Sequence, residues 1–526
     1  MFFCLRRIAS SINKRIKALR ESPAVSWVSS HLICSEVNKT EIGCTTIRGQ
    51  LAHHSGFRYD RKAFNRARMS PLILSSDQQQ VIADILQDVQ TSGSRLVLCG
   101  YAGTGKTVTT AALVKKLSLL KLTVVVATPT HKARSQVEKA LRANGADDFI
   151  CVTVHRLLGL RQVRNYATGE ESFEPHGENM LQTGILNDWT DFESSDHTRI
   201  DIVIVDETSM LHDNLYQLLI EQAGDRAIIF VGDDRQLLPV KENKPCAAFV
   251  EAHSIYRLTE VLRHDGAILS LATATRSLPV GRAKFIDVIS GGSQVIAYRR
   301  RDLWINALLE TMTSDFALND PDYARALAFI NKDVQELNRK IHERRYGFNA
   351  PQFMTGMTCI TVDAIPCPLG GKPLLNSTVE VSIESAELDS FKAPHDDESW
   401  DPWNTWILEV RDLDSGKALA IRALHRDEIT RWRSTQKHFA DLAKSCEDAK
   451  ERKIYWSMYF ERKDQIGQLE PASALTIHKS QGSTFKNVFL HWDIDGWGSA
   501  PSALQNQLSY VGITRAAESL HVLRDF

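Results

Sequence analysis

Short, uninterrupted apolar runs alternate with amphipathic stretches over much of the first half of the chain. The runs LVLC (96–99), VVVAT (124–128), IVIV (202–205) and AIIFV (227–231) are each four or five residues long. Runs of this kind fit strands that are buried on both faces of a parallel sheet, and the longer stretches between them fit helices. The alternation over residues 95–235 therefore predicts a doubly wound α/β sheet that binds its ligand at the strand carboxyl ends.

The second half of the chain begins with the same strand–helix pattern and then shows a different pattern. The segment ARALAFINKDVQELNRKIHERRYG predicts a strand followed by a helix. Residues 353–426 instead contain short alternating stretches (STVEVSI, TWILEV, ALAIRAL) between turns, which predict a small β-barrel, and residues 427–464 predict one or two charged helices. Trp400, Trp403 and Trp406 could stack on bases, but packing in the barrel core is the favoured interpretation.

Composition limits the number of domains and the class of protein. A chain of 526 residues can form two to four domains, and its hydrophobic content of 43% and charged content of 24% are ordinary for a globular protein. No run of about 18 apolar residues is present, so we expect no membrane span. The nine cysteines include no C-x-x-C pair, which favours buried or incidental thiols in a reducing compartment over a metal site.

The net charge of −1 conceals an asymmetry between the ends of the chain. Residues 1–68 hold 13 Lys/Arg against 4 Asp/Glu, a net charge of +9, and the remainder carries −10. The apolar residues of the first twenty positions recur at helical spacing among basic residues, as in a mitochondrial targeting helix. Three interpretations stay open: sequence upstream of a start at Met69, a targeting or membrane-surface segment, and a basic nucleic-acid arm.

A phosphate loop follows the first apolar run. Residues 100–107 read GYAGTGKT, the G-x-x-x-x-G-K-T pattern between a predicted strand and helix. Backbone N–H groups of this loop would surround nucleotide phosphates, Lys106 would reach the β- and γ-phosphates, and Thr107 would bind Mg²⁺. The predicted cofactor-binding residues of the loop are Gly100, Gly103, Thr104, Gly105, Lys106 and Thr107.

Two carboxylates and a glutamine complete the predicted catalytic centre. Asp206 and Glu207 come directly after the run IVIV, so both would face the phosphate loop at the same edge of the sheet. Asp206 would hold Mg²⁺ and Glu207 would polarise the attacking water. Gln236 follows the next strand, where its side chain could sense the γ-phosphate.

Together the motifs resemble those of the superfamily 1 helicases, and specifically the 5′→3′ branch of Dda-type phage helicases and RecD-like proteins. The motifs, in the order of that family, are LSSDQQQV, GYAGTGKT, ATPTHKA, TVHRLLG, VDETSM, VGDDRQLLPV, LTEVLRHDG, ALTIHKSQGSTFKNV and YVGITRA. The resemblance covers residues 72–526. One departure is Leu238, where the family commonly has a first of two prolines; it frees a backbone N–H and would loosen the turn before Pro239.

The resemblance implies roles for further residues. Gln78 would lie against the adenine, and Gly482 would contribute to the nucleotide site. Arg263 and Arg515 would act as arginine fingers when a second RecA-like domain folds against the first. Hydroxyl and imidazole side chains in three motifs would contact a sugar-phosphate backbone. These nucleic-acid residues are Thr130, His131, Thr153, His155, Thr476, His478 and Ser480.

The resemblance also implies the domain organisation. Residues 69–275 would form the first RecA-like domain, with an inserted subdomain at 161–199 that carries a strand-separating pin; Tyr166 and Phe173 are candidate pin residues. Residues 276–350 and 466–526 would form the second RecA-like domain, with residues 351–465 inserted as an SH3-like barrel and helical projection.

The predicted function is an ATP-dependent helicase that uses Mg²⁺ and moves 5′→3′ on single-stranded DNA. Its expected partners are single-stranded DNA and DNA junctions, together with single-strand-binding or replication and recombination proteins. We expect a monomer in the cytoplasm of a bacterial or phage-infected cell, or in mitochondria if residues 1–68 are a targeting segment. Two alternatives stay open: an RNA-directed helicase of the same superfamily, and a nucleic-acid clamp that ATP switches without strand separation.

Overall fold

A computed structural model of the chain describes residues 74–524, apart from 148, 178, 184–198, 239–243, 261–265, 279–284, 368–372, 397 and 497–501. The chain divides into two units, Met1–Met69 and Ser70–Phe526, and every described residue belongs to the second unit. The predicted N-terminal extension (1–68), Arg263, Pro239 and much of the segment 161–199 therefore lie outside the described residues.

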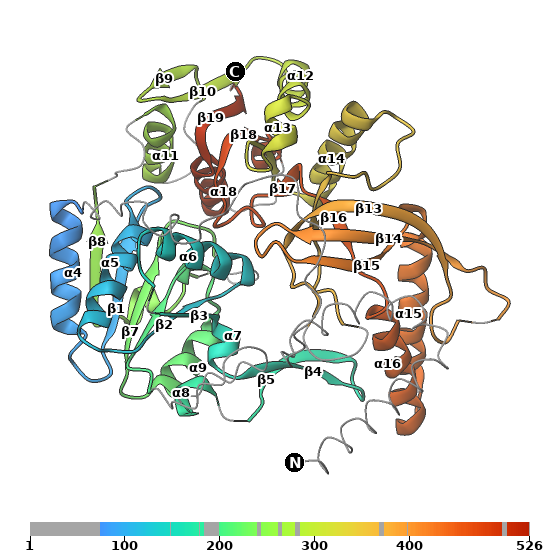
Figure 1. Cartoon of the computed structure of the whole chain (residues 1–526), viewed down its shortest axis with the longest axis horizontal. Coiled ribbons are helices and arrows are strands. Elements are labelled where there is room, and N and C mark those ends of the chain that lie inside the picture. The colour runs from blue at the N-terminus through green and yellow to red at the C-terminus, as the bar shows by residue number, and fades with distance from the viewer. Residues whose placement is uncertain are drawn as a thin grey trace, which may run out of the picture. The chain divides into compact units, whose positions relative to one another are not determined.

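The first domain is built on a six-stranded sheet of order β3-β2-β6-β7-β1-β8 in which every pair is parallel (Figure 1). A two-stranded antiparallel hairpin, β4–β5, extends from this domain. The elements are α4 (Ser76–Asp88), β1 (Arg95–Gly100), α5 (Lys106–Leu119), β2 (Val124–Thr128), α6 (His131–Ala143), β3 (Ile150–Thr153), α7 (Val154–Leu157), β4 (Leu160–Asn165), β5 (Glu170–Pro175), α8 (Met180–Thr183), β6 (Ile202–Val205), α9 (Asp213–Ala223), β7 (Ala227–Gly232), α10 (Ala248–Glu251) and β8 (Ser254–Leu258).

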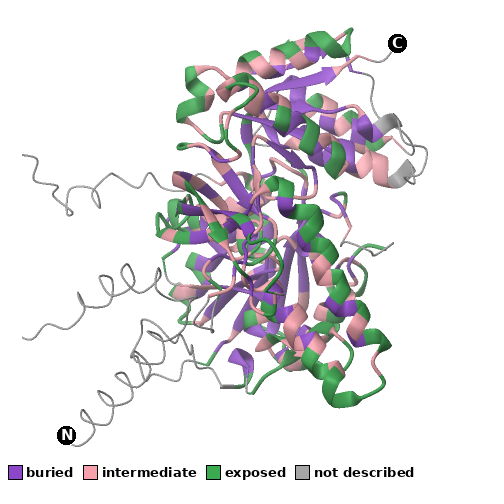
Figure 2. Cartoon of the chain, turned by 90° about the vertical axis from the view of Figure 1, so that its right-hand side faces the viewer, coloured by how far each residue is buried: buried purple, intermediate pink, exposed green. Residues whose placement is uncertain are grey.

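The strand residues of this sheet alternate between two hydrophobic cores. Leu96 and Leu98 of β1 pack with α4, α5 and α6 on one face, whereas Val97 and Cys99 pack with α7, α9 and α10 on the other. Because helices cover both faces, these strands are continuously apolar rather than alternating. Figure 2 shows the strands in the buried colour between helices with exposed outer surfaces.

The second domain has a six-stranded sheet of order β17-β11-β18-β19-β10-β9, parallel except for the β9–β10 pair. The predicted fold class, two α/β domains with parallel sheets flanked by helices, is therefore confirmed. Its elements are α11 (Ala267–Ser277), β9 (Val288–Ser290), β10 (Ser293–Tyr298), α12 (Arg301–Met312), α13 (Asp315–Asn319), β11 (Ala324–Ala328), α14 (Asn331–Tyr346), β17 (Ala474–Thr476), β18 (Phe485–Leu490), α17 (Asp493–Gly496), α18 (Ser502–Thr514) and β19 (Ala516–Leu523).

The helix α11 belongs to the second domain by its contacts. It packs against α18, β10 and β19, and Ala267, Ile268 and Ala272 are buried in the core of the second sheet. The sequence-based boundary at residue 275 placed this helix with the first domain, whereas its apolar face covers the second sheet.

The insertion between α14 and β17 is a five-stranded antiparallel sheet of order β15-β14-β13-β12-β16 and a helical pair. A bridge between Ala423 of β15 and Gly467, just before β16, brings the two edge strands together as in a barrel. Trp406 is buried in the core of this sheet, as predicted, whereas Trp403 is buried in a separate cluster with Trp432 of the first helix of the pair, and Trp400 is partly exposed. The elements are β12 (Thr358–Thr361), β13 (Glu380–Phe391), β14 (Trp403–Asp412), β15 (Ala418–Leu424), α15 (Ile429–Ser445), α16 (Ala449–Lys463) and β16 (Leu469–Pro471).

Of the helices in the described part of the chain, none combines the length and the apolar character that crossing a bilayer requires.

Candidate active site

The phosphate loop joins the end of β1 to the start of α5. Gly103 and Gly105 have φ angles of 87° and 78°, a left-handed conformation that glycine adopts without the strain of a Cβ. Helix α5 begins at Lys106, so the N–H groups of its first turn have no helical partner and its positive dipole end faces the loop. This is the arrangement that binds phosphate groups in nucleotide-binding proteins.

Gln78 supports the loop from behind. It is 1% exposed, and its Nε2 donates a hydrogen bond of 3.3 Å to the carbonyl oxygen of Thr104. The same side chain accepts from the backbone N–H of Ser75 and forms the capping box of α4. Gln78 therefore links α4 to the phosphate loop, and its predicted contact with adenine stays a prediction.

The amino group of Lys106 is turned toward carbonyl oxygens of its own loop. Its Nζ donates to Gly100 at 2.7 Å and to Tyr101 at 3.2 Å. A lysine of this loop donates to phosphate oxygens when a nucleotide binds, so Lys106 would have to leave these carbonyls. Thr107 follows in the first turn of α5 and is half-buried.

Asp206 and Glu207 follow β6, as predicted from the sequence. Asp206 is 5% exposed; burial and the neighbouring Glu207 carboxylate raise its pKa to about 7, although a backbone hydrogen bond and the charge of Lys106 act in the opposite direction. The N–H of Glu207 donates to Asp206 Oδ1 at 2.7 Å. The sheet thus places a buried carboxylate within electrostatic range of Lys106, where a cation would relieve the clustered negative charge.

The segment after β7 reaches the second domain. Gln236 is buried, and the next residue, Leu237, is fully buried in the hydrophobic core of the second sheet. Leu238 is half-buried, and its predicted loosening of the turn stays untested because Pro239 lies outside the described residues. The segment begins at the nucleotide edge of the first sheet. The burial of Leu237 in the second core attaches it to the second domain.

Arg515 lies at the end of α18 and is bound within the second domain. Its Nη1 donates to the carbonyl oxygen of Ser483 at 3.0 Å, and its Nε donates to that of Val511 at 3.2 Å. Gly482 directly precedes Ser483, whose Oγ receives a 3.4 Å hydrogen bond from Gln136 of α6. The predicted arginine-finger role of Arg515 therefore requires its guanidinium to exchange these carbonyls for phosphate.

A tyrosine that the sequence analysis did not single out joins the two domains at the loop. The N–H of Ala102 donates to the hydroxyl oxygen of Tyr510 at 3.0 Å, and that hydroxyl donates to Asp233 Oδ2 at 2.8 Å. The guanidinium of Arg276, on α11, lies 3.4 Å from the centre of the Tyr101 ring. Only the position of Tyr510 in the YVGITRA motif could have drawn attention to it.

The predicted nucleic-acid hydroxyls act mainly as helix and turn caps. Thr153, Thr476 and Ser480 are buried, and Ser480 donates to the carbonyl oxygen of Ile477 at 2.8 Å. Each hydroxyl thus satisfies a local backbone group, and the predicted contacts of these residues with nucleic acid stay predictions. The capping bonds run from Ala133 N–H to Thr130 at 3.2 Å, from Arg156 N–H to Thr153 at 3.3 Å and from Lys479 N–H to Thr476 at 3.2 Å.

The three predicted histidines share one electrostatic property. Desolvation lowers the pKa of His131 to about 4, with help from nearby Arg134, and it also lowers the pKa of His155 and of His478. All three imidazoles are therefore neutral at pH 7 and can offer hydrogen bonds but no charge. The ring of His155 lies 4.6 Å from that of Phe173, one of the candidate pin residues.

The β4–β5 hairpin docks on the helical pair of the insertion. Both Nη atoms of Arg164 donate to the carboxylate of Asp464, at 2.5 and 2.7 Å, and this hydrogen-bonded pair raises the pKa of Arg164. Lys463 pairs with Glu171 of the opposite strand. Two ion pairs thus connect elements that are almost 300 residues apart in sequence.

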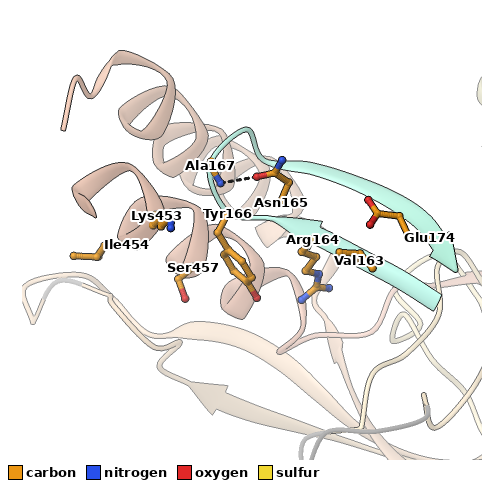
Figure 3. Close-up of a pocket in the computed structure, with 9 residues that line it drawn as sticks. All are labelled: Val163, Arg164, Asn165, Tyr166, Ala167, Glu174, Lys453, Ile454 and Ser457. Atoms are coloured by element: carbon orange, nitrogen blue, oxygen red, sulfur yellow. Dashed lines mark hydrogen bonds between the residues drawn. The ribbon is translucent and has the colours of Figure 1, made fainter. Parts of the chain in front are cut away.

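Aromatic contacts strengthen the same junction. Tyr166 lies edge-on to Phe460 with ring centres 5.5 Å apart, and a Cβ added at Gly169 would lie 2.2 Å from the Trp456 ring. An open cavity of about 750 Å³ lies between the hairpin and α16, with side chains of both elements on its wall (Figure 3). The exposed fractions of Tyr166 and Phe173 are 41% and 56%, so both candidate pin residues keep accessible surface.

Comparisons with known proteins agree with this architecture. Residues 73–300 match the model of an AAA domain, and residues 471–523 match that of a UvrD-like helicase C-terminal domain. The chain is 25% identical over 466 residues to the ATP-dependent DNA helicase dda of Enterobacteria phage T4, covering 84% of this chain and 97% of the relative. It is 22% identical to the RecBCD enzyme subunit RecD of Haemophilus influenzae, covering 82% of this chain and 66% of the relative.

Among solved structures, the crystal structure of the Pif1 helicase from Candida albicans matches 86% of this chain and 95% of that chain. The sequence identity is 17% and the TM-score is 0.42.

Proposed function

We propose, from the premise that this chain belongs to the superfamily 1 helicases, that it is an ATP-dependent DNA helicase that moves 5′→3′ on single-stranded DNA. One observation carries the proposal: the phosphate loop of the first sheet and the YVGITRA segment of the second are in direct contact through Ala102 and Tyr510. A nucleotide at the loop therefore acts on the relative position of two domains, which is what translocation requires.

The chain's own residues supply the groups that hydrolysis needs. Lys106 and the loop N–H groups would bind the phosphates, and Glu207 would polarise the attacking water. Arg515 would leave the carbonyl oxygens of Ser483 and Val511 to stabilise charge on the γ-phosphate when the domains close. Because Arg515 gains this partner only in the closed state, ATP favours closure.

The residues present fit Mg²⁺ as well. The Thr107 hydroxyl and the Asp206 carboxylate are oxygen ligands of the kind that Mg²⁺ prefers, and Asp206 is a buried acid beside a second acid, Glu207. The ion, when bound, neutralises phosphate charge. Thr107 and Asp206 would hold it.

The nucleic-acid track would cross the ends of α6, α7 and the segment 476–480. Neutral His131, His155 and His478 are the side chains best suited to hydrogen-bond a sugar-phosphate backbone there. The β4–β5 hairpin, held by Arg164 and Asp464, would separate the strands at a junction. Single-stranded DNA and DNA junctions are therefore the proposed partners; protein partners, oligomeric state and compartment stay predictions.

ATPase assays with single-stranded oligonucleotides test this function. We expect DNA to raise the turnover of ATP severalfold, RNA to raise it much less, and Lys106→Ala to abolish turnover. A preference for RNA would assign the chain to RNA-directed helicases, and slow turnover unaffected by either polymer would indicate an ATP-switched clamp.

A further inference from the structure

A histidine and two aspartates from separate elements meet at the carboxyl edge of the second sheet. His491 directly follows β18, Asp493 begins α17, and Asp333 lies in the first turn of α14. His491 Nδ1 lies 3.2 Å from Asp493 Oδ1 and 3.8 Å from Asp333 Oδ2. One nitrogen or oxygen atom from each side chain lies within 4.8 Å of the other two, so the three atoms are close enough to bind one ion.

The charge of this cluster is not balanced. His491 and Asp493 are 8% and 2% exposed, and the Asp333 side chain is 20% exposed. Within the described part of the chain, neither carboxylate forms an ion pair with a lysine or an arginine, and His491 is the basic group beside both. Even a protonated imidazole would leave one excess negative charge. Burial of such charge is costly unless a cation compensates it.

The two oxygen atoms of Asp493 have different surroundings. Its Oδ2 accepts from the N–H groups of Phe329 at 2.7 Å and Ile330 at 3.0 Å, which fixes the turn between β11 and α14. Its Oδ1 is buried, and no described residue donates a hydrogen bond to it. His491 Nδ1 accepts from the N–H of Asp493 at 3.2 Å, so this nitrogen carries no proton to donate. Two acceptor atoms therefore face each other, an arrangement that a bound cation stabilises.

The spacing and the donor atoms indicate which cation fits. Two bonds of about 2.1 Å at a tetrahedral angle place their ligand atoms about 3.4 Å apart. The measured separations from His491 Nδ1, 3.2 and 3.8 Å, lie on either side of this value. Mg²⁺ and Ca²⁺ prefer oxygen ligands alone, whereas Zn²⁺ binds imidazole nitrogen together with carboxylate oxygen. The donor set therefore favours Zn²⁺.

We propose that Asp333, His491 and Asp493 bind a Zn²⁺ ion that joins the end of β18 to the first turn of α14. Water completes the coordination of an ion held by three protein ligands. Through Asp493 the ion also fixes Phe329, whose ring centre lies 6.3 Å from that of His478. The three ligands lie outside the helicase motifs, so the site goes beyond the proposed function and does not depend on it.

Asp333→Ala tests the site because it removes one ligand at its most exposed position. Calorimetric titration of Zn²⁺ into the chelator-treated full chain, without nucleotide, measures stoichiometry and Kd. We expect the variant to bind one equivalent fewer, or to bind it with a Kd raised at least about 10–100-fold, the loss that even an outer-shell change produces. Glu336→Ala is the matched control: it removes an exposed carboxylate of the same helix and should change the Kd less than about twofold. Thermal unfolding verifies that both variants fold.

Co²⁺ gives a second readout, because its visible absorption depends on its ligands and their geometry. His491→Phe keeps a ring against Trp492, whose ring centre lies 4.0 Å from that of His491, and should abolish the Co²⁺ band of the unsubstituted chain. A band that persists in this variant overturns the inference. So does Zn²⁺ binding that is equal in Asp333→Ala and the unsubstituted chain. Absence of Zn²⁺ binding by the unsubstituted chain also overturns it, and leaves an ion pair of His491 with the two aspartates.

Discussion

Arg164 of the β4–β5 hairpin and Asp464 at the end of α16 meet through two parallel hydrogen bonds of 2.5 and 2.7 Å. A guanidinium that binds a carboxylate in this way is held in direction as well as in distance. The hairpin would otherwise project from the first domain on two strands only, which are marginally stable alone. The pair therefore gives the hairpin the stiffness that a strand-separating element needs.

Asp464→Asn should slow strand separation about 3–10-fold and leave DNA-stimulated ATPase within about twofold. The two side chains bond to one another and to Glu171 rather than to the phosphate loop, and a partly buried charge pair is worth about 1 kcal/mol. Displacement and ATPase assays on one preparation measure both. Asp441→Asn, an exposed change on α15, is the control. A parallel loss of both activities would contradict a role confined to the hairpin.

Glu380 joins three parts of the fold. Its carboxylate accepts from Arg325 of β11 at 2.9 Å and from Lys132 of α6 at 3.0 Å. Burial alone would raise the pKa of Glu380, but Arg325 and Lys132 outweigh it and lower the pKa to about 2. A carboxylate with a lowered folded-state pKa stabilises the fold fully above its unfolded value and loses this contribution as pH falls toward the folded value.

Glu380→Gln should therefore lower the free energy of unfolding by about 3 kcal/mol at pH 7, and the difference from the unsubstituted protein should shrink between about pH 4.5 and 2. Urea unfolding at pH 7 and pH 3 compares the two proteins. Glu409→Gln provides a control, since Glu409 on β14 is exposed. A difference that stays constant down to pH 3 would show that the ionised carboxylate is not the cause.

Gln78→Ala should raise the KM for ATP about tenfold with little change in kcat, because loss of the bond to Thr104 loosens the phosphate loop and the start of α4. Steady-state ATPase kinetics give both constants. Gln79→Ala is the matched control: Gln79 lies on the same helix, and its side chain donates to the carbonyl oxygen of Leu74 on the exposed side. If Gln79→Ala has the same effect, stability of α4 rather than the bond to the loop is responsible.

The neutral state of His131 leads to a prediction about how single-strand affinity depends on salt. Because its pKa is lowered to about 4, it contributes no charge above pH 7, and single-strand affinity should be equal at pH 7 and 8. His131→Lys adds a permanent charge on the proposed track and should steepen the slope of log Kd against log salt by about 0.7. Anisotropy titrations measure the slope. His438→Lys, at an exposed position of α15, should leave the slope unchanged.

Local motifs were predictable because their geometry is set by neighbouring residues. The strand, glycine turn and helix around Lys106, and the carboxylates after β6, lie where the sequence placed them. The capping roles of Thr153, Thr476 and Ser480 were missed, since a hydroxyl beside a helix start suits both a cap and a ligand contact.

Contacts between distant segments were not predictable in the same way. The bridge from Tyr510 to Ala102 and the pair of Arg164 with Asp464 depend on how whole domains pack. Tyr510 and Ala102 both lie in quoted motifs, but no local pattern in the sequence indicates that the two partners of either contact meet. Helix α11 was assigned to the first domain for the same reason, because an amphipathic helix between two sheets can cover either one.

The most direct test of the central claim is strand displacement by the full chain on duplexes with a single 5′ or 3′ tail, with Mg²⁺ and ATP and with Lys106→Ala as control. We expect displacement from the 5′-tailed duplex only, and none with the variant. Displacement from the 3′ tail alone would contradict the assigned direction. Failure on both duplexes, with ATPase intact, would contradict the claim that this chain is a helicase.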